Sequence, residues 1–241
     1  MTTGKKRFCG LLIGWLFLTT ALITHDLWRK PTARAVFGMV WGLILFWIVG
    51  VGLLTLRYRQ PLREWAVELH WPRWLLFTLL ATVLALIEET VTVSMTNLAP
   101  LFGVRIGEAY ITASTNYLDV VAMHSVVVFV PQFAAWGFLL SRYAFSPFQV
   151  FLLFGLTGML DEAMFGGPQA FQAFAQWIFV YGLMVYLPAY CLPRNPRARP
   201  VPWWLYPVAL LLPILSAVPF VLLLKLLAPN HPSIHFPPIQ F

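Results

Sequence analysis

Two adjacent pairs of acidic residues lie inside long apolar runs of this sequence, where ionisable side chains are rare. Glu88 and Glu89 interrupt the run 74–97, and Asp161 and Glu162 interrupt the run 147–166. A charged side chain in such surroundings is costly, by about 2.5–3.5 kcal/mol for Asp at the centre of a membrane helix. The acids should therefore face a protein interior or a water-filled cavity, and they are the first candidates for proton transfer, hydrolysis or cation binding.

His124 is the only histidine of the sequence well inside an apolar run, which extends over 118–141. Counted at about 1.5 Å per residue, Glu88 and Asp161 lie roughly 21 Å from one end of their runs, and His124 reaches the same depth from the opposite end. We therefore expect His124, Asp161 and one of Glu88 or Glu89 to approach within about 3–6 Å of one another.

Neighbouring residues on an α-helix are about 100° apart, so only one of Glu88 and Glu89 can point at a given spot. We expect that residue to act as acid or base, with His124 orienting water or relaying the proton. The residues expected to position a substrate, a partner or a cation are Asp161, Glu162, Thr92 and Asn97. The alternative is that these polar groups only fasten the helices by interhelical hydrogen bonds.

The sequence leaves the cofactor and any metal unassigned. A catalytic zinc ion usually has three protein ligands, and histidine is prominent among them. One embedded histidine among carboxylates provides too few nitrogen ligands for such a site. Zinc is therefore the weaker hypothesis from the sequence.

The elements that must position these residues are transmembrane helices. Of the 241 residues, 60% are hydrophobic and only 10% are charged, and the mean hydropathy is +0.76. A water-soluble protein of this size would need a charged exterior, so the apolar exterior must face lipid. The sequence predicts an all-α polytopic membrane protein, a single domain over 1–241. Its seven transmembrane helices are expected at about 8–24, 36–56, 74–97, 118–141, 147–166, 171–192 and 203–227.

The net charge is +7, and the positions of the Lys and Arg residues along the chain indicate the membrane topology. With seven crossings, most Lys and Arg residues fall on the side of the N-terminus, and the positive-inside rule makes that side cytoplasmic. We therefore expect a multi-pass protein of the inner (plasma) membrane, with the N-terminus in the cytoplasm and the C-terminus outside. Basic residues at the ends of apolar runs do not form a nucleic-acid surface, and no nucleic-acid partner is expected.

Two segments outside the expected spans are distinctive. Residues 98–117 mix Gly, Ser, Thr, Asn and Tyr with apolar residues and are long for a loop in a compact bundle. They are expected to form a plain outer loop or, alternatively, an outer lid or re-entrant segment. Residues 228–241 form a C-terminal tail that contains Pro and His and is expected on the outer side.

An adjacent Glu-Glu pair on one helix, followed by a histidine near the start of the next, resembles the glutamate-dependent CAAX-protease-like family of intramembrane proteases. The resemblance implies that Glu88 activates the hydrolytic water, that Glu89 completes the pair and that His124 is the first assisting histidine. Val93 stands where the family motif has an arginine.

The pair Glu88-Glu89 followed by Thr96-Asn97 also resembles a repeat motif of membrane lycopene-type cyclases. In that family carboxylates protonate an alkene, so this resemblance implies acid chemistry on an isoprenoid. Leu160-Asp161-Glu162 resembles a fragment of a second copy.

Three functional hypotheses follow. The first is a membrane-embedded hydrolase or acid-base enzyme that acts on a lipid-soluble substrate, such as a peptide or an isoprenoid. The second is a proton- or cation-coupled carrier that uses the same acids as a relay. The third is a non-catalytic subunit of a larger membrane complex. The expected partners are membrane lipid, a lipid-soluble substrate and the other subunits of such a complex.

Overall fold

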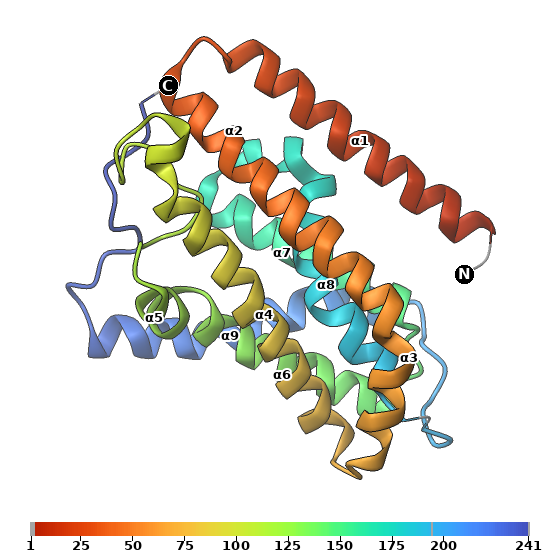
Figure 1. Ribbon diagram of the computed structural model, residues 1–241. Coiled ribbons are helices and arrows are strands. Elements are labelled where there is room, and N and C mark those ends of the chain that lie inside the picture. The colour runs from red at the N-terminus through yellow and green to blue at the C-terminus, as the bar shows by residue number, and fades with distance from the viewer. Residues whose placement is uncertain (1–2, 194, 241) are drawn as a thin grey trace.

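The computed structural model describes residues 3–193 and 195–240, and within these ranges the protein is all-helical without a β-strand (Figure 1). The N-terminal half contains α1 (Thr3–Leu27), α2 (Pro31–Leu43), the π-helical segment η1 (Ile44–Val51), α3 (Gly52–Glu68), α4 (Arg73–Asn97) and the short η2 (Ala99–Phe102). The C-terminal half contains α5 (Tyr117–Asp119), the π-helical turn η3 (Val120–His124), α6 (Val126–Arg142), α7 (Pro147–Gly166), η4 (Pro168–Ala173), α8 (Phe174–Cys191) and α9 (Leu205–Leu227).

Helices long and apolar enough to cross a membrane dominate the described part of the chain, as a multi-pass membrane protein requires. Five such segments are Thr3–His25, Pro31–Glu68, Arg73–Asn97, Ala170–Cys191 and Leu205–Leu227. A sixth is formed if Tyr117–His124 and Val126–Arg142, which are bent by 49° relative to each other, are taken as one broken span.

The seven expected spans are therefore matched at five positions, and at a sixth if the bent pair is one span. The remaining run, 147–166, does form a helix, α7, with the expected bounds. It is not among the apolar segments above.

Helices α4, α6, α7 and α8 form the centre of the bundle. Helix α7 approaches α8 closely because Gly155 has no side chain: a Cβ atom there would lie 2.7 Å from the Cα and carbonyl oxygen of Ile178. Small residues permit this close packing of membrane helices. The packing carries Asp161 and Glu162 into the interior between α6 and α8.

Helix α1 lies along one edge of the molecule, whereas α2, η1 and α3 form one continuous helix across it (Figure 1). The indole Nε1 of Trp47 donates a hydrogen bond to the carbonyl oxygen of Val180 at 3.0 Å, which ties this long helix to α8.

The loop between α6 and α7 meets the loop between α8 and α9 at one end of the bundle. The N–H of Arg199 donates to the carbonyl oxygen of Arg142, and the N–H of Ala144 donates to that of Arg199, both at 2.9 Å. The side-chain amide of Asn195 donates to the carbonyl oxygen of Ser141 at 2.9 Å. The loop that precedes α7 and the loop that follows α8 are thus joined by hydrogen bonds.

The C-terminal tail, described over 228–240, folds back over the opposite end. It leaves α9, passes the segment 103–116 and reaches the start of α2 (Figure 1). The N–H of His235 donates to the carbonyl oxygen of Ala113 at 2.9 Å, and the hydroxyl of Thr32 donates to that of Gln240 at 2.7 Å. The tail is therefore a packed part of the fold.

Candidate metal centre

A π-helical turn brings Asp119 and His124 onto one face of the helical segment that precedes α6. The N–H of Ser125 donates to the carbonyl oxygen of Val120 at 3.0 Å, five residues earlier, which is the hydrogen bond of a π-turn. On an α-helix, residues five apart point about 140° away from each other. The wider π-turn removes most of that angle, so the carboxylate and the imidazole project together.

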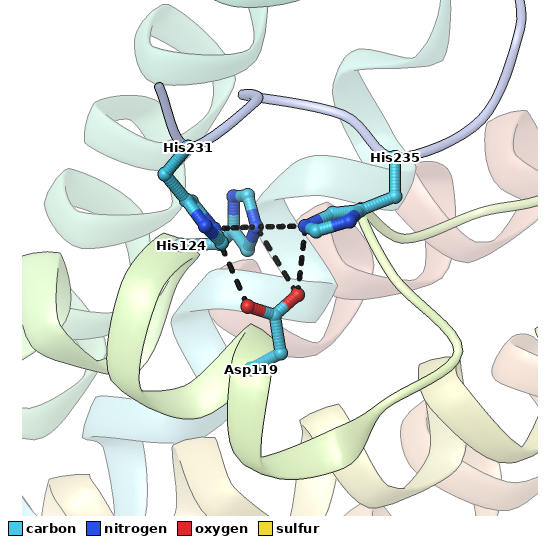
Figure 2. A group of neighbouring side chains, drawn as sticks. All are labelled: Asp119, His124, His231 and His235. Carbon is cyan, nitrogen blue, oxygen red and sulfur yellow. Dashed lines mark hydrogen bonds and ion pairs between the residues drawn. The ribbon is translucent and has the colours of Figure 1, made fainter. Parts of the chain in front are cut away.

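The C-terminal tail supplies two further histidines, His231 and His235. The backbone bond from His235 to Ala113 fixes the tail beside this turn, and the ring of Phe236 stacks on Tyr110 with 4.7 Å between centroids. Figure 2 shows that His231 and His235 reach from the tail toward Asp119 and His124 on the helical segment.

The four side chains present one ligand atom each to a common point, and these atoms all lie within 4.8 Å of one another. Nε2 of His124 is 3.1 Å from Nε2 of His231 and 3.4 Å from Nε2 of His235. The Asp119 carboxylate oxygens lie 3.6, 3.3 and 2.8 Å from Nε2 of His124, His231 and His235, respectively (Figure 2). In a tetrahedral site with bonds of about 2.0–2.1 Å, neighbouring ligand atoms are about 3.3 Å apart. The observed separations bracket that value.

The orientation of Asp119 also favours a shared cation. Its Oδ2 atom is buried and has no hydrogen-bond partner among the described residues, although Nε2 of His235 is only 2.8 Å away. A buried carboxylate oxygen without a hydrogen bond is costly. A metal ion between the four groups would satisfy this oxygen and the three facing nitrogens together.

Three imidazole nitrogens and one carboxylate form a ligand set that suits Zn²⁺, with Fe²⁺, Co²⁺, Ni²⁺ and Cu²⁺ as chemical competitors. Mg²⁺ and Ca²⁺ prefer all-oxygen sites. The side chains of His124 and Asp119 are 11% and 16% exposed, whereas those of His231 and His235 are 22% and 32% exposed. The tail side is therefore the side from which a ligand can approach.

The four predicted acids gather in a different place, which we call the acid cluster: Glu88, Glu89, Asp161 and Glu162. Glu88 and Glu89 on α4 are only 5% and 6% exposed. Glu88 and Glu89 lie near enough to Glu162 to act on it electrostatically, and Asp161 and Glu162 on α7 are partly buried. The two acidic pairs of the sequence thus lie near each other in the bundle.

Three acids of the cluster, Glu89, Asp161 and Glu162, accept hydrogen bonds. The donors lie on a neighbouring helix for Asp161 and Glu162 and on the same helix for Glu89. The hydroxyl of Tyr181 on α8 donates to Glu162, and the amide nitrogen of Gln132 on α6 donates to Asp161 at 3.0 Å. The hydroxyl of Thr92, predicted as a positioning residue, donates to Glu89 at 3.1 Å.

Asn97, the other predicted positioning residue on α4, lies at the end of the helix, away from these contacts. Its side-chain amide donates to the carbonyl oxygens of Val93 and Thr115, at 3.0 and 2.9 Å. It therefore holds the segment 98–117 to α4.

His124 contacts Asp119, His231 and His235, whereas the acids of the cluster are held by Thr92, Gln132 and Tyr181. Ser125, which follows His124, lies near Glu89, and its hydroxyl donates to the carbonyl oxygen of Val120 at 3.3 Å. The predicted residues therefore form two neighbouring sites, one around His124 and one around the acid pairs.

Sequence reasoning missed Asp119, His231 and His235. One signal was available, because His231 and His235 have the His-x₃-His spacing found in zinc sites. Asp119 and His124 offered none, since their spacing is typical of opposite helix faces.

Comparison with protein-family models, with curated proteins and with solved structures finds no match to this chain. The geometry of the two sites is therefore the basis for a functional proposal.

Proposed function

We propose that this protein is a membrane-embedded, metal-dependent enzyme whose centre is formed by Asp119, His124, His231 and His235. The observation that carries the proposal is the convergence of four ligand atoms within 4.8 Å, with separations suited to tetrahedral coordination. The reaction class that we favour is hydrolysis or acid-base chemistry on a lipid-soluble substrate.

The chemistry of such a centre supports this reaction class. A bound divalent metal polarises a carbonyl or phosphoryl oxygen and lowers the pKa of a bound water molecule to near neutrality. Asp119, His124, His231 and His235 would hold the metal, which would supply a Lewis acid; a water or substrate would join it by expansion to five ligands, which zinc sometimes undergoes, or by replacing one of these side chains. A water or substrate would reach the metal from the exposed side of the site, at His235.

Glu89 is the acid of the cluster best placed to exchange a proton with this centre. It lies near Ser125, the residue next to His124, and it accepts a hydrogen bond from the hydroxyl of Thr92 at 3.1 Å. The resemblance to CAAX-protease-like enzymes implies a glutamate that activates water. In this chain we assign that proton-transfer role to Glu89 rather than Glu88.

The lipid-soluble substrate class follows from the surroundings of the centre. The helices that flank it belong to segments apolar enough to span a membrane, and α9, which leads into the tail, is largely exposed with apolar side chains. A substrate dissolved in lipid would reach the site along these surfaces without crossing bulk water.

We further propose that α7 completes seven spans, because α7 packs between α8 and α9 and its acids are covered by neighbouring helices. In that arrangement the N-terminus is cytoplasmic, the metal centre lies near the outer face of the inner membrane, and the C-terminus is outside. A cysteine introduced at Ser233 should react with an impermeant maleimide in intact cells, whereas one introduced at Asn195 should not. The reverse pattern would contradict the orientation.

The direct test is the metal content of the purified protein, measured by inductively coupled plasma mass spectrometry. We expect one transition-metal ion per chain. His235→Ala or His124→Ala should lower metal affinity by more than the 10–100-fold that loss of an outer-shell partner costs. His70→Asn is the matched control, because His70 lies outside the site and asparagine tolerates its positive φ of 53°. Wild-type protein that binds no transition metal would refute the proposal.

The enzyme hypothesis itself is tested with fluorogenic prenyl-peptide esters and amides in liposomes. Turnover should follow metal loading. Glu89→Gln should abolish turnover while metal content and thermal stability stay unchanged, because an amide keeps the shape of the carboxyl group but cannot exchange its proton. Loss of stability in parallel with turnover would instead indicate that Glu89 only fastens the helices.

The competing hypotheses are a proton- or cation-coupled carrier and a non-catalytic subunit of a membrane complex. The observation that favours a carrier is the buried acid cluster, which lies among helices that span the bundle. Uptake of a cation into proteoliposomes that does not depend on His124 or His235 would favour the carrier.

A further inference from the structure

A groove of about 530 Å³ lies between the start of α4 and the last turns of α6, at the end of the bundle where the loop before α7 and the loop after α8 are joined. It is lined by Trp74, Ala134, Phe138, Ser141 and Arg142. Trp74 and Phe138 are 50% and 51% exposed, so two large aromatic rings face the outside of the molecule. Sites for small molecules have volumes of about 300–1,000 Å³, and the groove is therefore large enough for a ligand.

Arg73, the first residue of α4, lies beside this groove with most of its hydrogen-bond donors unused. Its Nη2 atom donates to the carbonyl oxygen of Leu140, the residue before Ser141, at 3.2 Å. Its Nε and Nη1 atoms are buried and have no hydrogen-bond partner among the described residues. A guanidinium group contains donors only, so no exchange of its atoms supplies the missing acceptor. Because a buried donor without an acceptor is costly, Arg73 favours a negatively charged ligand at this place.

Arg142 lines the groove from the last turn of α6, and an aromatic ring holds it there. Its Cζ atom lies 3.6 Å from the centroid of the Phe138 ring. A guanidinium group packed over a ring keeps N–H groups at its edge for a bidentate bond to a phosphate.

The positive charge of this end is not balanced by the chain itself. Neither Arg142 nor Arg73 forms an ion pair within the part of the chain that the structure describes. The backbone N–H of Arg199 donates to the carbonyl oxygen of Arg142, which brings a third, exposed arginine to the same end. The groove therefore complements an anion.

The other wall of the groove is apolar and belongs to membrane-spanning segments. Trp74 lies in the apolar segment Arg73–Asn97, and Phe138 lies in Val126–Arg142. Tryptophan is enriched where lipid chains meet headgroups, and basic pockets between membrane helices bind anionic headgroups. A ligand with a phosphate at one end and apolar chains at the other matches both walls, whereas a free phosphate would leave the aromatic wall uncovered.

We propose that this groove binds one anionic phospholipid, with its phosphate group at Arg142 and Arg73 and its acyl chains along the aromatic wall. In the orientation proposed above, the groove faces the cytoplasmic leaflet, which carries anionic lipids. The site lies at the opposite end of the molecule from the metal centre, and it goes beyond the proposed enzyme function.

The test is native mass spectrometry of the delipidated protein in detergent, titrated with dioleoyl phosphatidylglycerol or with dioleoyl phosphatidylcholine. The two lipids have the same chains and differ in the net charge of the headgroup. We expect one phosphatidylglycerol molecule per chain to bind about tenfold more tightly than phosphatidylcholine, as expected for hydrogen bonds to a charged group. Inorganic phosphate is added in a separate titration and should not displace the lipid.

Variants locate the bound lipid. Arg142→Gln and Arg73→Gln each remove one cation, so each should lower the affinity for phosphatidylglycerol about tenfold. Ala134→Leu keeps both cations but fills part of the groove, and it should also weaken binding. Arg57→Gln is the matched control, because Arg57 is an exposed arginine on α3 that also lies over a ring, that of Tyr58. It should bind phosphatidylglycerol like the wild type.

The unfolding midpoint is measured in parallel, so that only folded variants are compared. Arg142 is exposed, and Arg142→Gln should fold and keep the wild-type metal content, which separates this proposal from the metal centre. The proposal is overturned if the two lipids bind alike or if folded Arg142→Gln binds phosphatidylglycerol like the wild type. It is equally overturned if inorganic phosphate displaces the lipid, which would show a site for the free anion.

Discussion

The metal centre and the acid cluster are neighbours built in opposite ways. The acid cluster comes from pairs of adjacent residues on two regular helices, α4 and α7, and receives hydrogen bonds from Gln132 on α6 and Tyr181 on α8. The metal centre combines a π-helical turn with an irregular tail, and its histidines from the tail remain partly exposed. One site is positioned by helix packing, whereas the other, as we propose, is completed by a bound metal ion.

This difference indicates which interactions hold the side chains of each site in place. Helix packing positions the acids whether or not a ligand is bound, because glycine contacts such as Gly155 against Ile178 belong to the bundle core. The tail is held to the segment 103–116 and to α2 by single hydrogen bonds and one ring stack, and a metal ion would join it to the helical segment 117–124. The two sites should therefore respond to different changes.

The largest expected effect is release of the tail when the metal is removed. A chelator, or His231→Ala, should raise amide hydrogen exchange at His235, whose N–H donates to Ala113, by about tenfold or more, the equivalent of about 1.4 kcal/mol. Exchange within α7 and α8 should not change. Mass spectrometry of peptides from the tail and from α8 measures both. A tail that stays protected after chelation would show that the metal does not hold it.

A change in helix packing should affect the acid cluster alone. Gly155→Ala places a methyl group 2.7 Å from the backbone of Ile178, so α7 and α8 must separate, and the free energy of unfolding should fall by about 1–3 kcal/mol. The hydrogen bonds that Gln132 and Tyr181 donate to the acids of α7 should be disturbed, while transition-metal content stays the same.

The matched control is Gly14→Ala on α1, where a Cβ atom meets nothing within 4 Å. Its effect should be neutral or slightly stabilising, because alanine favours helix more than glycine does. Urea unfolding in mixed micelles measures both variants. Equal effects at Gly155 and Gly14 would mean that the α7–α8 contact does not matter.

Removal of a single hydrogen bond in the acid cluster should have a smaller effect. Tyr181→Phe deletes the hydroxyl that donates to Glu162, and interhelical bonds of this kind contribute about 0.6 kcal/mol on average and at most about 1.7. The same unfolding assay should detect the loss, and metal content should stay at the wild-type value. A drop in metal content would show that the two sites are coupled through α8.

The smallest effect is expected at Glu108, an exposed acid that contrasts with the buried cluster. The backbone N–H and the guanidinium group of Arg105, both at 2.8 Å, hold the pKa of Glu108 below its ordinary value. This contribution to stability is present above the unfolded-state pKa and is lost as the pH falls through the lower folded-state pKa. Arg105→Ala should raise the pKa only part of the way, since the backbone bond remains.

Carbon-13 NMR titration of the Glu108 carboxyl group measures this shift. Because the pair is exposed, thermal stability at neutral pH should scarcely change. A full return to the ordinary pKa would mean that the guanidinium group, not the backbone bond, is the main cause.

The sequence alone determined the class of the protein and the positions of its helices. Long apolar runs with few charges require lipid, and α7, which begins after Ser146 at Pro147, has the predicted bounds of Pro147–Gly166. Adjacent acids in such runs must avoid lipid: Glu88 and Glu89 are buried, and Asp161 and Glu162 accept hydrogen bonds from Gln132 and Tyr181. This part was predictable because its cause, the cost of a charge in lipid, acts on each residue locally.

Only the tertiary structure decided the partners of His124. Depth counting gives the level of a side chain in the membrane but not its rotation about the helix axis, because apolar residues occur on every face. The π-turn then changes that rotation, and the partner His231 lies 107 residues away in a tail without helical periodicity. Contacts made across such a distance depend on how the whole chain packs, and no local pattern around Asp119, His124 or His231 contains that information.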